Sequence, residues 1–76
     1  MGIAVLVRWD PEASVWVATS DDVPGLATEA ATAEALRDKV LIMIPELLEL
    51  NGHSSSDHGD VPLSFRYEED RVLRIA

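Results

Sequence analysis

The strongest periodic signal in the chain lies in residues 32–52, which read TAEALRDKVLIMIPELLELNG. Apolar side chains recur there at spacings of three and four, which predicts an amphipathic helix; they are Leu36, Val40, Met43, Leu47 and Leu50, with Ile44 and Leu48 widening the stripe. The hydroxyl of Thr32 can accept a free backbone N–H at the start of the helix, and Asn51-Gly52 is a typical stop signal. We therefore expect a helix that begins at Ala33.

Pro45 lies inside this stripe. Its missing N–H, and the clash of its ring with the carbonyl of Leu41, predict either a kink or a split into segments 33–44 and 45–51. Because the apolar stripe continues in phase beyond the proline, we expect a kink.

The segments on either side of the helix have the composition of strands. Runs 3–9 and 14–20 are rich in β-branched residues and flank the turn sequence Asp10-Pro11-Glu12-Ala13, which predicts an antiparallel hairpin. Pro24-Gly25 predicts a second turn before a short strand at 26–30. After the helix, residues 61–67 alternate as a fourth strand, and residues 72–75 form either a fifth short strand or a tail that crosses to another subunit.

This element order predicts one α+β domain spanning 1–76, with an antiparallel β-β-β-α-β sheet and one kinked helix on one face. A single helix covers only one face of a sheet, yet the strands carry apolar residues on both faces. Whichever face the helix covers, a surplus of apolar side chains remains on the other face. This surplus is either Trp16, or Leu6 together with Val17. We interpret this surplus as an interaction surface, and the alternative is the apolar exposure that every protein surface has.

Composition narrows the classes of partner. Fourteen acidic and six basic residues give a formal charge of −8, which disfavours direct binding to nucleic acids or anionic membranes and attracts a basic protein; plain solubility is the alternative reading. There is no cysteine, and the longest apolar run, 40–44, is far too short to span a bilayer. No basic segment precedes the apolar N-terminus, so we expect a cytoplasmic protein that is not exported.

Several motifs in this order resemble those of the HicB-like antitoxins, especially a branch of short stand-alone chains classed as a domain of unknown function. The motifs are Trp9-Asp10-Pro11-Glu12-Ala13, Val15-Trp16-Val17-Ala18, Asp22-Val23-Pro24-Gly25-Leu26, Thr32-Ala33-Glu34-Ala35-Leu36 and Pro45-Glu46-Leu47-Leu48. The resemblance implies a reduced RNase H-like fold and an antitoxin that neutralises a small basic RNA-cleaving toxin of the HicA type. Many relatives carry a C-terminal DNA-binding segment, and we expect none here.

The candidate partner-binding residues are Leu6, Trp9, Trp16, Asp21 and Asp22. Tryptophan is frequent in binding hot spots, although core packing explains the two tryptophans equally well and turn chemistry explains the two aspartates. We also expect a homo-oligomer, a dimer or a tetramer, because a core this small is marginal without disulfides or metal. A self-associating structural or regulatory protein without a toxin partner is the alternative function.

We expect neither catalysis nor a cofactor nor a metal site. The interior of the first strand, residues 4–7, has no carboxylate of the kind that an RNase H-like nuclease needs to hold two metal ions. The segment that follows the helix contains the residue types of a metal site or a catalytic triad, but its serine-rich composition predicts a solvated loop; these residues are His53, Ser54 to Ser56, Asp57, His58 and Asp60.

Overall fold

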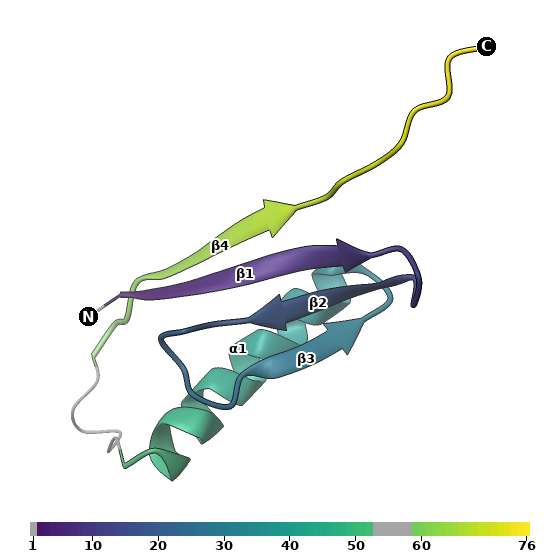
Figure 1. Cartoon of the computed structure of the whole chain (residues 1–76). Helices are drawn as coiled ribbons and strands as arrows, with labels where there is room; N and C mark the ends of the chain where they lie inside the picture. The colour runs from purple at the N-terminus through teal and green to yellow at the C-terminus, as the bar shows by residue number, and fades with distance from the viewer. Residues whose placement is uncertain (1, 53–58) are drawn as a thin grey trace.

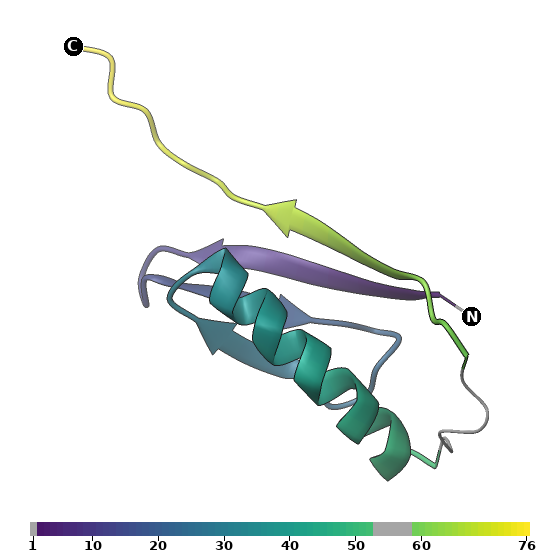
Figure 2. The same cartoon turned by 180° about the vertical axis from the view of Figure 1, so that it is seen from behind.

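The computed structural model describes residues 2–52 and 59–76 of the chain. Its elements, in chain order, are β1 (Ile3–Asp10), β2 (Val15–Thr19), β3 (Ala27–Ala30), α1 (Ala33–Leu50) and β4 (Leu63–Glu68). The four strands form one sheet in the order β3-β2-β1-β4, and α1 crosses one of its faces (Figures 1 and 2). The α+β class predicted from the sequence is confirmed.

The β1–β2 hairpin and the β2–β3 pair are antiparallel, as predicted. Trp9 pairs with Trp16 at the turn end of the hairpin. The turn is held by the carboxylate of Asp10, which accepts hydrogen bonds from the backbone N–H groups of Glu12 at 3.0 Å and Ala13 at 3.3 Å. Ser14 completes the reversal with a positive φ of 56°.

The prediction of a fully antiparallel sheet was wrong, because β4 pairs with β1 in parallel, with Val5 opposite Phe65. The reason lies in the number of chain reversals. Each element runs back against the one before it, so β1, β3 and β4 share one direction, while β2 and α1 run the other way (Figure 1). Only a place beside β2 would have made β4 antiparallel, and β2 already lies between β1 and β3.

The helix α1 begins where the sequence predicts, with the Thr32 hydroxyl accepting from the N–H of Ala35 at 3.1 Å. It continues through Pro45 as one helix, so the alternative of two segments is not observed, and Figure 2 shows no sharp kink along it. Pro45 leaves the carbonyl of Leu41 without its helical donor. Since Leu41 lies on the exposed side of α1, water can supply that hydrogen bond.

The core lies between α1 and the sheet. Its buried side chains come from alternate positions of β1, from Ala18 and the loop after β2, and from one stripe of α1; they are Ile3, Val5, Val7, Ala18, Val23, Leu26, Leu36, Val40, Ile44 and Leu48. The helix packs mainly against β2 and β3. The helix-side residues of β4 are therefore covered less well, and Tyr67 remains 50% exposed.

Residues 69–76 continue beyond β4 and project away from the sheet (Figures 1 and 2). We call this segment the C-terminal arm. It is exposed along its whole length and gives the molecule its elongated extents of 58 × 19 × 18 Å.

Candidate functional site

The face of the sheet opposite α1 is not covered by any described element, and we call it the open face. Alternation along β1 directs Ile3, Val5 and Val7 to the helix, so Leu6 points the other way. Side chains from all four strands share this face; they are Ala4, Leu6 and Arg8 of β1, Val15, Val17 and Thr19 of β2, Ala27 and Glu29 of β3, and Ser64, Arg66 and Glu68 of β4. Its centre is apolar and its margins are charged.

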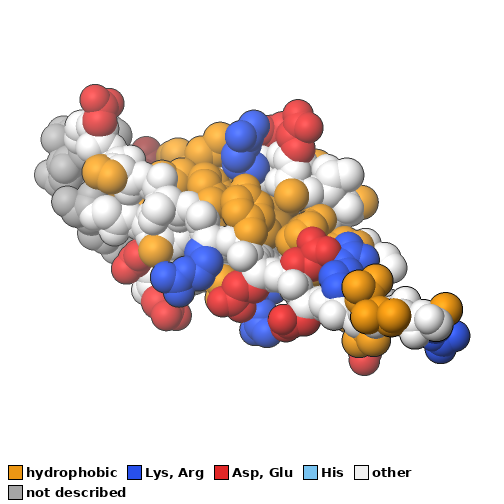
Figure 3. Space-filling model, turned by 90° about the horizontal axis from the view of Figure 1, so that it is seen from above, with side chains coloured by type: hydrophobic (Ala, Val, Ile, Leu, Met, Phe, Trp, Pro, Cys, Tyr) orange, Lys and Arg blue, Asp and Glu red, His pale blue; other side chains and the backbone are white. Residues whose placement is uncertain are grey.

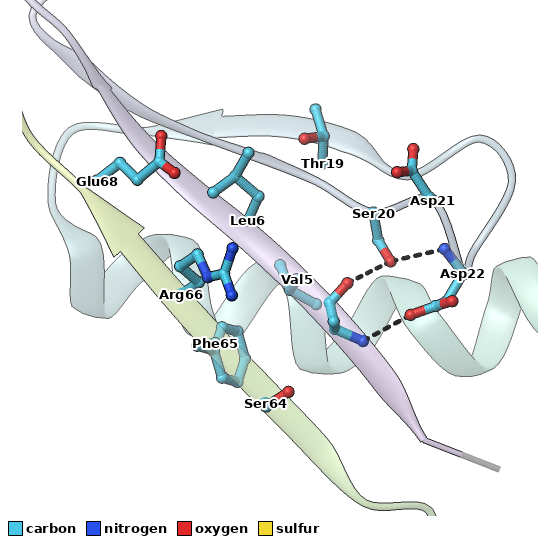
Figure 4. Close-up of a pocket in the computed structure, with 11 residues that line it drawn as sticks. Val5, Leu6, Thr19, Ser20, Asp21, Asp22, Ser64, Phe65, Arg66 and Glu68 are labelled. Atoms are coloured by element: carbon cyan, nitrogen blue, oxygen red, sulfur yellow. Dashed lines mark hydrogen bonds between the residues drawn. The ribbon is translucent and has the colours of Figure 1, made fainter.

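One end of the open face forms an open depression of about 600 Å³ (Figure 4). Leu6 lies on its floor, and Arg66 and Glu68 border it on the β4 side. The opposite border is the segment that leaves β2, residues 19–22. The depression therefore presents an apolar floor between two polar walls.

The β2-side wall of the depression is fixed to the backbone of Ala4. The last residue of β2, Thr19, pairs with Leu6, so the ladder no longer satisfies β1 at Ala4 on this side. Side chains replace it: the carboxylate of Asp22 accepts from the Ala4 N–H at 2.8 Å, and the Ser20 hydroxyl donates to the Ala4 carbonyl at 2.6 Å (Figure 4). The N–H of Asp22 in turn donates to the Ser20 oxygen at 3.1 Å. The side chains of Asp22 and Ser20 thus bond the backbone groups of Ala4 that a longer β2 would have paired with.

The charges of the open face are of both signs. The Arg8 guanidinium lies 3.6 Å from the Glu68 carboxylate, and both side chains are about half exposed or more, so this pair contributes little to stability. Asp21 is exposed at one end of the face, and Glu29 is exposed on β3. A partner that meets this face therefore meets arginine near β4 and carboxylates at both ends.

The predicted partner-binding residues do not form one site. Leu6, Asp21 and Asp22 come together at the depression. Trp9 and Trp16 lie on the helix side of the sheet, where their rings pack against each other with centroids 5.3 Å apart at 59°. Trp16 also packs against the hydrophobic core, which supports the core-packing reading for this residue.

Two residues that the sequence reasoning did not place in the site complete these two regions. Tyr67 joins the tryptophans, with its ring centroid 6.5 Å from that of Trp16. Arg66 enters the depression from β4. The alternation within residues 61–67 separates these two side chains onto opposite faces, but only the pairing of β4 with β1 shows which neighbours each one meets.

Within residues 2–52 and 59–76, no three His, Asp or Glu side chains are grouped so that they could hold a metal ion. The histidine- and serine-containing stretch 53–58, weighed above as a metal or triad site, lies outside the described residues. In the same described part of the chain, no helix has the length and apolar character to cross a membrane.

The comparisons with known proteins identify relatives without a stated activity. No curated protein matches the chain. A crystal structure of the hypothetical protein TTHA1013 from the extremely thermophilic bacterium Thermus thermophilus is similar, with 51% sequence identity and a TM-score of 0.71 over 99% of this chain and 100% of that one. A family model described as a domain of unknown function, DUF1902, matches residues 3–75. The chain therefore belongs to the DUF1902 family.

Proposed function

We propose that this protein is an antitoxin of the HicB-like kind, which neutralises a small basic RNA-cleaving toxin by covering it with the open face. The resemblance of the turn and capping motifs to HicB-like antitoxins suggests the class of partner. The observation that carries the proposal is the sheet face that α1 leaves uncovered, with Leu6 and Val17 at its centre.

The apolar centre of the open face is suited to a protein partner. Leu6 lies on the floor of the depression, and Ala4 borders it. Protein interfaces characteristically have an apolar centre with a polar rim, and the rim here consists of Asp21, Arg66 and Glu68. Burial of the centre would supply affinity, while the rim would select the partner.

The overall charge indicates the sign of that partner. With a formal charge of −8, the chain attracts a cationic protein over a Debye length of about 8 Å at physiological salt. Nucleases that bind RNA need a cationic surface to hold its phosphates. An acidic domain placed over that surface would compete directly with RNA.

The test uses the product of the reading frame next to the gene, if that frame encodes a small basic protein. RNA cleavage by this product is measured with increasing amounts of the wild-type chain, of Leu6→Asp and of Ile42→Asp. Ile42 is a matched control, since it is 65% exposed on α1 and lies away from the open face.

We expect stoichiometric inhibition by wild type and Ile42→Asp, and a loss of inhibition of at least tenfold for Leu6→Asp. Circular dichroism establishes that both variants fold. A neighbouring product that does not cleave RNA, or inhibition that Leu6→Asp leaves unchanged, would contradict the proposal.

Self-association is the second candidate function, and one specific observation favours it. The C-terminal arm carries large apolar side chains that no described part of the chain covers.

A further inference from the structure

The C-terminal arm exposes aliphatic side chains to an unusual degree. Val72 is 99% exposed, Leu73 is 82% exposed and Ile75 is 85% exposed. Eight residues of extended chain reach about 26 Å at roughly 3.3 Å per residue. The arm projects away from its own sheet (Figure 1). A segment with this composition, held away from its own core, has the character of an arm that packs on another molecule.

Among the described residues, the strand from which the arm continues has a free edge. β4 is the last strand in the order β3-β2-β1-β4, so its outer backbone groups face away from the sheet. An edge of this kind is a template for another strand. Figure 3 looks down on this edge and shows hydrophobic surface beside it, and again on the projecting arm.

Alternation places most apolar residues of β4 and of the arm on one side, and Val72, at an even-numbered position, on the other. Phe65 is partly buried against the core and Tyr67 stacks on Phe65, with centroids 6.4 Å apart, so odd-numbered positions face the helix side. Arg71 keeps this phase beyond the strand, because its guanidinium lies 5.2 Å from the centroid of the Trp9 ring. Continued alternation beyond Arg71 would give Leu73 and Ile75 the same phase.

On the helix side, the sequence of β4 and the arm is complementary to itself when it is reversed about Asp70; on the open-face side it is not, because Glu68 then lies opposite Val72 and Arg66 opposite Arg74. In an antiparallel pair of two copies centred there, every helix-side contact joins residues of matching kind, apolar with apolar and acid with base. The contacts are Phe65 with Ile75, Tyr67 with Leu73, and Glu69 with Arg71, each made twice.

Shifting this register by two residues in either direction places Glu69 opposite Glu69, or Arg71 opposite Arg71, on the helix side. Like charges directly opposite each other are destabilising. The centred register also opposes like charges on the open-face side, where the two copies of Asp70 meet and Arg66 lies directly opposite Arg74 at two contacts. Water and salt screen charges that stay solvated.

We propose that two copies of this chain pair antiparallel along β4 and the arm, about a twofold axis at Asp70, and so join their sheets into one of eight strands. In this dimer Leu73 and Ile75 of each arm cover Tyr67 and Phe65 of the other copy, where α1 leaves β4 poorly covered. The interface is isologous, because the same residues contribute from both copies. The inference does not require the toxin proposed above.

The test uses the contact of Glu69 in one copy with Arg71 in the other. Reversing the charge of each residue in turn distinguishes this ion pair between copies from the Glu69–Arg71 ion pair within one chain. Glu69→Arg and Arg71→Glu are prepared singly, and each variant then opposes like charges at both contacts of the dimer. An equimolar mixture of the two variants restores opposite charges at both contacts, whereas the Glu69–Arg71 ion pair within a single chain stays broken in both. Sedimentation equilibrium measures the mass against the chain mass of 8.3 kDa.

We expect wild type to sediment at twice the chain mass, each single variant to dissociate at least tenfold more readily, and the mixture to regain the wild-type affinity within about threefold. The control mixture combines Glu12→Arg with Arg37→Glu, which carry the same changes of net charge at exposed sites on the first turn and on α1. Neither control variant should change the mass.

A double variant, Leu73→Asp with Ile75→Asp, tests the apolar contacts and should be a folded monomer by circular dichroism and sedimentation. Wild type that stays monomeric at millimolar concentration would overturn the proposal. So would a mixture that stays as weak as the single variants, a control pair that behaves like the test pair, or a dimer that survives the double arm variant.

Discussion

Removing the carboxylate of Asp22 separates its role in the fold from a role in recognition. In the structure this carboxylate accepts the hydrogen bond from the Ala4 N–H at 2.8 Å, in the place where β2 no longer pairs with β1. Asp22→Ala removes that bond, while Asp21→Ala, in the same loop, is the matched control. Trp9 and Trp16 report unfolding by fluorescence during urea titration.

A hydrogen bond contributes about 0.5–1.5 kcal/mol, and more when one partner is charged. Because both residues are exposed, water will satisfy part of what is lost, so we expect Asp22→Ala to lower the free energy of unfolding by about 1 kcal/mol. For a domain of this size that corresponds to a fall in Tm of roughly 4–8 °C. Adding Ser20→Ala removes the bond to the Ala4 carbonyl as well, and should bring the total to about 2 kcal/mol.

Equal losses of unfolding free energy in Asp22→Ala and Asp21→Ala would refute this expectation. If Asp22→Ala and Asp21→Ala differ by less than about 0.3 kcal/mol, within the error of such comparisons, the network at Ala4 does not stabilise the fold. If Asp22→Ala is then also defective in binding the toxin proposed as the partner, its carboxylate serves recognition and not the sheet. Measurements at several protein concentrations keep the contribution of self-association separate.

Three further changes have expected outcomes. Leu36→Ala should lower the free energy of unfolding by about 2–5 kcal/mol, because Leu36 is fully buried, whereas Ile42→Ala should change it by less than about 0.5 kcal/mol. Urea titration compares the two variants, and equal effects would place the core elsewhere. Pro45→Ala should stabilise the chain by about 1–3 kcal/mol, because it restores the N–H that the carbonyl of Leu41 lacks; a fall in Tm would show that Pro45 has a packing role. Association with a basic toxin should slow as salt rises while dissociation changes less, and stopped-flow rates that ignore salt would assign the charge of −8 to solubility alone.

The local elements of this fold could be predicted from the sequence because their signals are local. The Thr32 cap and the stripe through Leu36 and Val40 locate the start and the buried side of α1. Asp10 and the residues after it locate the first turn, where the aspartate bonds to its own neighbours. In each case the residues that carry the signal are the residues that make the contact.

The placement of the candidate site depends on pairings between distant segments, and these were only partly predictable. Alternation along the strands predicts that Leu6 and Trp16 lie on opposite faces of the sheet, but not which of them faces the helix. The pairing of Leu6 with Thr19 and of Trp9 with Trp16 decides this, and it directs both tryptophans to the helix side. The parallel pairing of β4 was missed for another reason: the predicted element order gives the direction of β4, but its neighbour is set by the strand order, which local composition does not display.

The two proposed contacts use different parts of the sheet and can be made together. Pairing along β4 and the arm extends the sheet sideways, and a twofold axis perpendicular to the sheet leaves both helices on one side and both open faces on the other. Each open face then keeps Leu6 and Val17 accessible. A dimer formed through its edges would therefore bind two toxin molecules, and self-association would double the net negative charge that attracts a basic partner.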